Sequence, residues 1–162
     1  MITKKHVMLI TCGACILGLS ALGSLKNPVT RPHKGVGQFH VVINVGNPMG
    51  TGDGSFDATG VGQGTHTGKF LSHLQGKVDP ITLTPPTSGS LSGTVTAANG
   101  DQFFIRGEPD GSTTVTGGTG RFVGATGSQT SAVVGTPVVS YDPGTGTLTI
   151  DATETLEGTL TY

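Results

Sequence analysis

The stretch that most restricts the fold lies in the middle of the chain, at residues 89–108, "GSLSGTVTAANGDQFFIRGE". Small or apolar residues alternate there with serine and threonine, which is the two-residue period of a half-buried strand. The run "NGD" at Asn99–Asp101 supplies residues that tolerate the left-handed backbone of a tight turn, and "QFFIR" is the return strand. The segment therefore predicts an antiparallel β-hairpin.

The remainder of the chain has the same character. It contains 28 glycines, abundant threonine and valine, and no amphipathic helical stretch after residue 25. Only 12% of its residues are charged and its net charge is -1, whereas disordered chains normally combine high net charge with few β-branched residues. A length of 162 residues fits one domain. We therefore expect one all-β domain of many short strands.

Strands and connections can be placed by periodicity and by turn residues. Residues 24–37, "SLKNPVTRPHKGVG", hold two prolines and no periodicity, which predicts a flexible linker or arm. Glycine-rich turn chemistry predicts a loop over 46–55 and a turn over 143–146. Besides the hairpin, strands are expected over residues 39–45, 61–71, 77–86, 112–118, 136–142 and 147–162.

The N-terminus reads as a secretory signal. Two lysines in Met1–His6 precede the uncharged, largely apolar run Val7–Leu25, which predicts a helical signal segment with cleavage after Gly23. An uncleaved membrane anchor is an alternative, because 19 apolar residues just span a bilayer, and a lipoprotein is a third. Cleavage predicts a protein that is secreted, periplasmic or on the cell surface.

Export would remove both cysteines, Cys12 and Cys15, together with Lys4 and Lys5. The remaining chain would have no disulfide, thiol nucleophile or thiolate metal site. It would carry seven basic residues against ten acidic ones, a net charge near −3 (7 − 10). This balance gives no basic surface for nucleic acid, and it leaves a membrane partner only for an uncleaved anchor.

Two segments echo each other. "GTHTGKF" at Gly64–Phe70 and "GGTGRFVGATG" at Gly117–Gly127 share the pattern T-G-[KR]-F. Glycines on one face let a strand bend tightly, while the phenylalanine covers the gap and the basic residue faces solvent. Alternation along 61–71 would also put His66 on one face with Phe70 and three glycines. Two such bends in one small sheet favour a closed barrel, which leaves no exposed strand edge.

Neither nucleotide nor metal binding is indicated. The 117–127 segment lacks the G-K-[ST] ending of a phosphate loop, breaks G-x-G-x-x-G at its last glycine, and precedes no expected helix. The histidines at 33, 40, 66 and 73 form no H-x-H or H-x-x-x-H pair. Asp53 and Asp57 are too few for an EF-type calcium loop, and we interpret them as solvated loop acids. We expect no metal and no cofactor.

Four blocks occur in order along the chain: "GTHTGKF", "GTVTAANGDQFF", "GGTGRFVGATGS" and "LEGTLTY". In these blocks residues 38–162 resemble small exported bacterial β-proteins of the allene oxide cyclase/dirigent barrel-like group. The resemblance implies an eight-stranded antiparallel barrel with a central cavity, in a domain spanning 38–162. The plant members' functional residues cannot be matched position by position, so the resemblance implies the fold and leaves the function open.

If the barrel has a functional cavity, the candidates are His66, Arg106 and Glu108. His66 would have glycine-made space beside it and titrates near neutrality, while Arg106 could pair with Glu108 or clamp a carboxylate. The alternatives are a hydrogen-bonded structural histidine and a surface arginine. Asn99–Asp101 is interpreted as turn chemistry, and no G-x-S-x-G elbow indicates a serine hydrolase.

Three functions remain open. The leading hypothesis is a non-catalytic binding or surface-structural protein that holds a small apolar ligand. The first alternative is a cyclase-like or dirigent-like enzyme that acts on a substrate in the barrel. The second is a self-assembling extracellular structural subunit, with homo-oligomers formed through its strands. An apolar cavity of several hundred Å³ would favour the first two, whereas a solidly packed barrel would leave only assembly.

Overall fold

The structure is a computed structural model that describes residues 27–45 and 54–162. The expected signal segment 1–23 with its cleavage site, Cys12 and Cys15 lies outside the described residues, as do residues 46–53 of the expected loop.

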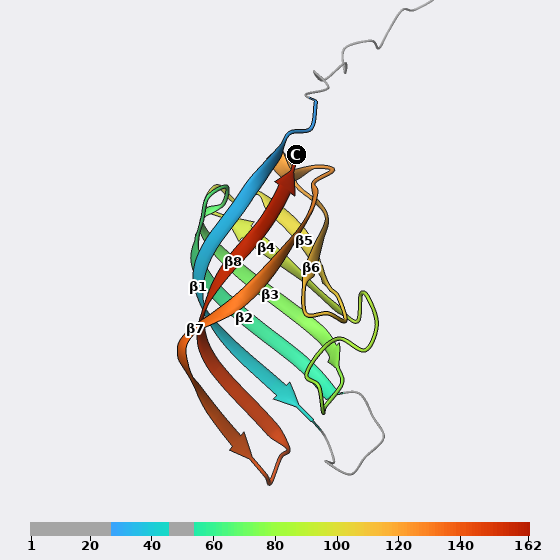
Figure 1. The fold of residues 1–162 in the computed structure, drawn as a ribbon, viewed down its shortest axis with the longest axis vertical. Coiled ribbons are helices and arrows are strands. Elements are labelled where there is room, and N and C mark those ends of the chain that lie inside the picture. Colours follow the sequence, from blue (N-terminus) through green and yellow to red (C-terminus); the bar gives the residue numbers. More distant parts are fainter. Residues whose placement is uncertain (1–26, 46–53) are drawn as a thin grey trace, which may run out of the picture.

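Eight antiparallel strands form a closed barrel (Figure 1). Each strand pairs with its neighbour along the chain, and β8 pairs with β1 from Thr30↔Thr161 to Asn44↔Thr147, which closes the sheet. The eight-stranded antiparallel barrel expected from the sequence is confirmed. The strands are β1 (Thr30–Asn44), β2 (Gly54–Gly64), β3 (Gly68–Val78), β4 (Leu91–Ala97), β5 (Gln102–Gly107), β6 (Thr113–Gly118), β7 (Thr126–Asp142) and β8 (Thr147–Thr161).

The central hairpin is confirmed. β4 and β5 pair antiparallel around the turn at 98–101, where Gly100 has a φ of +86°. Leu91, Val95 and Ala97 are buried, as the alternation of this segment predicted. The strands expected over 112–118, 136–142 and 147–162 are also present, and β7 begins well before the expected 136.

Three expected boundaries are wrong. β1 begins at Thr30, so residues 30–37 are strand and not linker. Pro32 is tolerated there because β1 pairs with β2 only from Gly35, which leaves Pro32 without a strand neighbour on one side. The expected strand 61–71 is two strands, β2 and β3, joined by a turn over residues 65–67. The expected strand 77–86 ends at Val78, and residues 79–90 form turns and bends.

Aromatic side chains close one end of the barrel. Phe103 and Phe122 are 1% and 0% exposed, and their rings meet edge to face with centroids 5.4 Å apart. The Phe122 ring also meets that of Tyr162, the last residue, at 5.1 Å. The motif around Phe122 is therefore scaffold, as predicted, and its first glycine, Gly117, lies at the register shift between β5 and β6. Gly120–Phe122 is one turn of 3₁₀-helix between β6 and β7.

Inward-facing glycines make room for two further aromatic rings, those of Phe39 and Phe70. Gly60 and Gly62 lie on the inner face of β2, and a Cβ atom at either would come within 2.5 Å of the Phe39 or the Phe70 ring. Real Cβ atoms do not approach so closely, so larger residues would force the rings to move. The small residues that weaken a hydrophobic pattern thus make room for aromatic side chains inside a narrow barrel.

The barrel has one weakly paired seam. β6 and β7 pair at only three positions, from Thr113↔Gln129 to Val115↔Gly127. Beyond them, residues 130–134 and 138–142 of β7 pair with β8, and residues 135–137 form an irregularity between the two stretches. In the described part of the chain, none of the residues 130–142 has a strand neighbour on the other edge. In Figure 1 this part of β7 runs on with β8 as a hairpin below its label.

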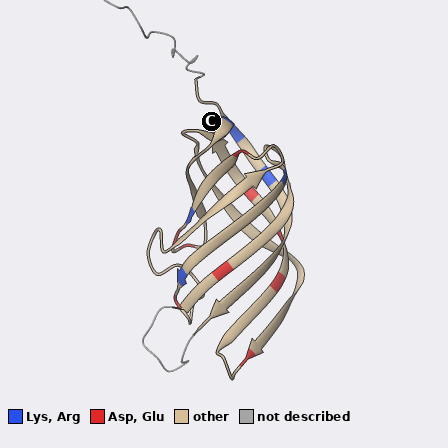
Figure 2. Cartoon of the chain, turned by 180° about the vertical axis from the view of Figure 1, so that it is seen from behind, with Lys and Arg blue, Asp and Glu red and all other residues tan. Residues whose placement is uncertain are grey.

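Charged side chains are sparse on the barrel. In Figure 2 the lysines and arginines of the described residues appear as a few short blue bands on the ribbon. Several are paired on the surface, as Lys34 is with Glu157 at 3.3 Å. In the ranges 27–45 and 54–162, no helix has the length and apolarity that a transmembrane span requires.

Candidate functional site

A cavity of about 290 Å³ lies inside the barrel. Its wall combines residues of all eight strands with residues of the β3–β4 and β5–β6 connections, such as Pro85 and Ser112. A packed protein interior has few voids larger than a water molecule, so a space of this size is an uncommon feature for a small core. The barrel is therefore not packed solid.

The greater part of the wall is apolar. It includes four phenylalanines, at 39, 56, 70 and 103, with valine, leucine and isoleucine side chains from β1 and β3–β5. Phe39, Leu74 and Leu156 are only partly buried and pack against the main core cluster from its margin. Period-2 alternation produces this wall, because each strand sends every second side chain inward.

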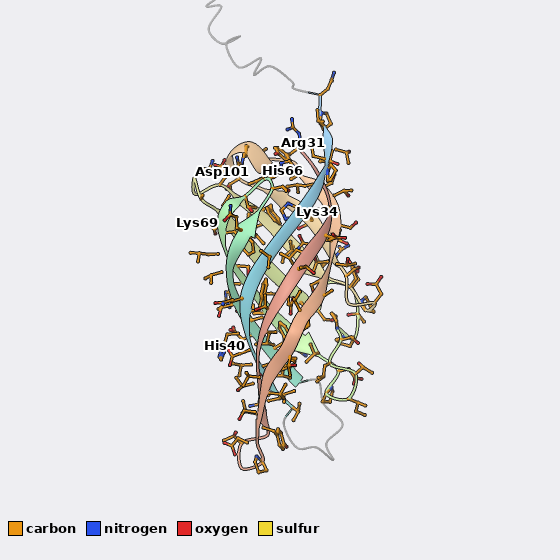
Figure 3. All side chains as sticks on the ribbon, turned by 60° about the vertical axis from the view of Figure 1, so that its left-hand side comes forward. Arg31, Lys34, His40, His66, Lys69 and Asp101 are labelled. Carbon is orange, nitrogen blue, oxygen red and sulfur yellow. The ribbon has the colours of Figure 1, made fainter. Side chains whose placement is uncertain are left out.

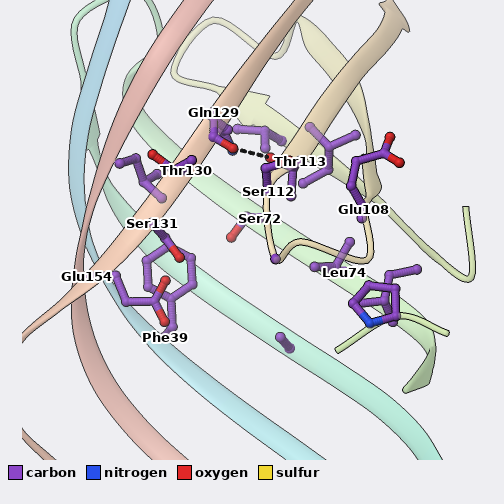
Figure 4. A pocket seen from close by; sticks show the side chains of 18 of the residues that line it. Phe39, Ser72, Leu74, Glu108, Ser112, Thr113, Gln129, Thr130, Ser131 and Glu154 are labelled. Atoms are coloured by element: carbon purple, nitrogen blue, oxygen red, sulfur yellow. Dashed lines mark hydrogen bonds between the residues drawn. The ribbon is translucent and has the colours of Figure 1, made fainter. Parts of the chain in front are cut away.

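A few polar groups interrupt the apolar wall. Ser72, Gln129, Ser131 and Glu154 come from three strands (Figure 4). Near the seam, the Thr113 hydroxyl donates a long hydrogen bond to the Gln129 carbonyl oxygen (3.5 Å), drawn as a dashed line in Figure 4. Such a wall, apolar with a few placed polar groups, is typical of small-molecule sites.

Glu154 is the carboxylate on the inner face of β8. It shares that face with Ala152, which is 9% exposed, and with Leu156. The β1 residue opposite Glu154 is Gly37, and Phe39 and Ser131 are its diagonal neighbours on the two adjacent strands. Figure 4 shows Glu154 beside both of these side chains. Its carboxylate makes no hydrogen bond and no ion pair with any of the described residues.

His33 also faces the cavity and is more deeply buried than Glu154. Its side chain lines the cavity, is only 3% exposed, and leaves Nδ1 without a hydrogen-bond partner in the described part of the chain. Its ring lies 6.0 Å from that of Phe103 and 6.2 Å from that of His66. Burial, and then the charge of His66, lowers the pKa of His33, so the ring is neutral at pH 7.

His66 does not line the cavity. It sits in the turn between β2 and β3, at the same end of the barrel as Asp101 (Figure 3). Its Nε2 donates a hydrogen bond to the Pro32 carbonyl oxygen (2.9 Å), and its ring lies 6.0 Å from the Tyr162 ring. The structural alternative for this histidine therefore fits the contacts it makes.

Arg106 and Glu108 are brought together, as one hypothesis required. Arg106 Nε donates to Glu108 Oε1 at 3.0 Å. Arg106 faces outward on β5, between the buried Ile105 and Gly107, so of this pair only Glu108 lines the cavity. The pKa of Glu108 is lowered by a hydrogen bond from Ser88, the largest cause, and by hydrogen bonds from Thr114 and Arg106. Glu108 is therefore ionised at the edge of the cavity.

Sequence reasoning missed the two groups that face the cavity from β1 and β8. Glu154 could have been found, since alternation along "TLTIDATETLEGTL" puts it on the same face as Leu148, Ile150 and Leu156. His33 was hidden by its neighbours, because a proline and two glycines beside it remove the apolar alternation.

Two histidine–aspartate pairs lie on the outer surface, His40 with Asp151 (2.7 Å) and His73 with Asp57 (2.9 Å). Nowhere in the described residues do three or more histidine, cysteine or carboxylate side chains gather as a metal ion would need. Comparison with known proteins gives no further guide: no protein-family model, no curated protein and no solved structure matches this chain.

Proposed function

We propose that this protein binds a small apolar ligand inside its barrel. The observation that carries the proposal is the cavity of about 290 Å³ with four phenylalanines in its wall. Apolar surface facing an empty space gains about 25 cal/mol for each Å² that a ligand covers. A barrel interior that is already folded around such a space also loses little entropy when a ligand enters.

Access to the cavity supports the proposal. Thr130 and Ser131 of β7 line the cavity just beyond the last residue pair between β6 and β7. Both residues are exposed, as is Gly111 in the β5–β6 connection across the seam. A ligand could therefore enter beside the weakly paired edge without opening a long ladder of strand hydrogen bonds.

We place the protein outside the cytoplasm, as an exported binding protein, on the strength of the lysine-led apolar run before Gly23. Its similarity to the allene oxide cyclase/dirigent barrel-like group remains a proposal that rests on the sequence blocks. A cyclase-like or dirigent-like enzyme has less support, because neither His66 nor Arg106 reaches the cavity. Within that alternative, Glu154 would be the acid–base group to test.

Native mass spectrometry of the protein purified without denaturant tests ligand binding. We expect the wild type to carry a small organic molecule and the cavity-filling variant Ser72→Phe to lose it. The matched control is Leu71→Phe, which changes the next residue of β3 on the outer face, where Leu71 is 61% exposed. Equal ligand loss in both variants, or none in Ser72→Phe, would contradict binding in the barrel.

A second candidate, self-assembly, is favoured by the free edge of β7. Thirteen consecutive residues, 130–142, lack a strand neighbour on that edge in the described ranges, and Asp142 is their only charged residue. Val134 and Val138 are 51% and 68% exposed on the outer face of this segment. An exposed edge with a single charge is a template for pairing with the same edge of a second copy, here in two stretches separated by Pro137 and the irregularity at 135–137.

Light scattering on the intact protein tests this candidate. We expect a dimer that dissociates in Val138→Lys, because two copies of a new charge would meet at the paired edges. Thr149→Lys is the control, since Thr149 lies on β8, away from the free edge. A wild-type protein that stays monomeric at its highest soluble concentration would rule out assembly through β7.

A further inference from the structure

We propose that the cavity selects ligands with a protonated amino group on an apolar body, and that Glu154 holds the amino group. This inference deepens the proposed binding function and rests on it. It names the chemical class of the ligand from the charges that line the barrel.

Glu154 lines the cavity, so a ligand inside the barrel can reach its carboxylate. The residue is half-buried on the inner face of β8, and the β1 position directly opposite is Gly37. Glycine at this position leaves room for the Phe39 and Phe70 rings, since a Cβ atom on Gly37 would come within 3.0 Å of the first and 3.2 Å of the second. Phe39 and Ser131, its diagonal neighbours, supply an aromatic ring and a hydroxyl beside the carboxylate.

Within residues 27–45 and 54–162, no basic side chain pairs with Glu154. The wall of the cavity contains no lysine and no arginine among the residues that the structure describes, and His33, its one basic side chain, is held neutral by burial. The other glutamates differ, since Glu108 pairs with Arg106 and Glu157 with Lys34. Glu154 is the glutamate left for a ligand.

The charge of the wall decides which head group is favoured. A carboxylate beside apolar surface loses part of its hydration. A cation within hydrogen-bond distance of the carboxylate compensates for that loss. A ligand carboxylate would instead meet like charges on Glu154 and Glu108. A nearby phenylalanine ring further favours a cation over a neutral group.

The size of the cavity bounds the ligand. At the packing density of a protein interior, about 290 Å³ accommodates roughly ten non-hydrogen atoms. Three compounds with a phenyl ring and a short chain match this size and differ in head group: 2-phenylethylamine, 2-phenylethanol and 3-phenylpropanoate. Aromatic probes suit a wall that carries four phenylalanines.

Isothermal titration of the full chain with these three probes at pH 7.5 tests the inference. We expect the amine to bind about tenfold more tightly than the alcohol, and the carboxylate most weakly, as for a hydrogen bond to a charged group. Glu154→Gln keeps the shape of the side chain and removes its charge. It should weaken amine binding about tenfold and leave alcohol binding within about twofold.

The matched control is Glu157→Gln, the same substitution on the same strand but on the outer face, where Glu157 is exposed. It should leave the affinities for all three probes unchanged. Circular dichroism of each variant verifies the fold.

The outcomes separate the two proposals. If the alcohol binds wild type as tightly as the amine does, or Glu154→Gln binds the amine undiminished, amine selection is wrong and the binding function stands. If none of the probes binds and the purified protein carries no ligand, both proposals are wrong.

Discussion

Phe103 and Phe104 show how a barrel strand separates neighbouring residues into different environments. Phe103 is 1% exposed and packs against the rings of His33 and Phe122, whereas Phe104 is 38% exposed on the outer face. We expect Phe103→Ala to lower the free energy of unfolding by about 3–5 kcal/mol, because it leaves a cavity in the closed end of the barrel.

Phe104→Ala is the control, and its cost should stay below about 1 kcal/mol. Chemical denaturation with a common m-value measures both. Equal losses in the two variants would contradict the inward and outward assignment of β5.

His33 makes stability depend on pH. Its pKa is lowered by burial and by His66, so the folded protein resists protonation of this ring while the unfolded chain takes up a proton below about pH 6.5. The unfolded state then binds more protons, and the free energy of unfolding falls as the pH drops below about 6.5.

His33→Gln should flatten this dependence between pH 7 and pH 5, measured by urea unfolding at each pH. His40 and His73 pair with Asp151 and Asp57 in both proteins, so their contribution is common to both curves. Parallel curves for wild type and variant would show that His33 is not the group responsible.

At the scale of elements, Asp101 connects two turns. Its Oδ2 accepts hydrogen bonds from Asn99 Nδ2 (2.6 Å) in its own turn and from the Arg121 backbone N–H (3.3 Å) in the 3₁₀ turn. The Arg121 side chain also approaches it, at 3.7 Å, and lies over the Phe122 ring. The β4–β5 turn thereby fixes the segment that closes the barrel end.

Asp101→Ala should lower the free energy of unfolding by about 1–2 kcal/mol, because it removes hydrogen bonds between elements. Asp110→Ala is the control, since the carboxylate of Asp110 accepts bonds from Ser112 within its own connection. Differential scanning calorimetry compares the two variants. A larger loss in Asp110→Ala would contradict a bracing role for Asp101.

The predicted strands and turns were correct where apolar alternation and turn residues indicate the same element. The hairpin from Leu91 to Gly107 has both, so its strands and its "NGD" turn were correctly placed. The errors lie where glycine or proline takes an inward or edge position, as around Pro32 and at Gly62 and Gly64. A glycine that makes room for a ring has no hydrophobic signal of its own, and only the pairing of strands reveals its role.

The candidate site was less predictable because it depends on which strand faces meet. The cavity follows from the barrel, but His66 was placed on its wall through the missed turn at 65–67. Glu154 needed only correct alternation along β8, whereas the absence of a partner for its carboxylate depends on all the neighbouring strands. The local sequence pattern thus predicts on which face of a strand a side chain lies, whereas the contacts of that side chain depend on how the strands pair.

At the scale of the whole molecule, the seam divides the sheet into a well-paired wall and a weakly paired one. β1 pairs with both β2 and β8, so its backbone N–H groups between Gly35 and Asn44 have partners on either side. Over residues 130–134 and 138–142, β7 pairs with β8 alone. Amide hydrogens without a partner exchange with solvent by local fluctuation, whereas those within a paired sheet require larger openings.

Hydrogen exchange followed by NMR should therefore show slow exchange along β1 and alternating slow and fast amides along residues 130–134 and 138–142 of β7. Raising the protein concentration distinguishes the state of that edge, because pairing with a second copy would slow the fast amides and ligand entry alone would not. Uniformly slow exchange over 130–142 in a protein shown to be monomeric would mean that the seam is closed by strand pairing. The proposed entrance to the cavity would then be wrong.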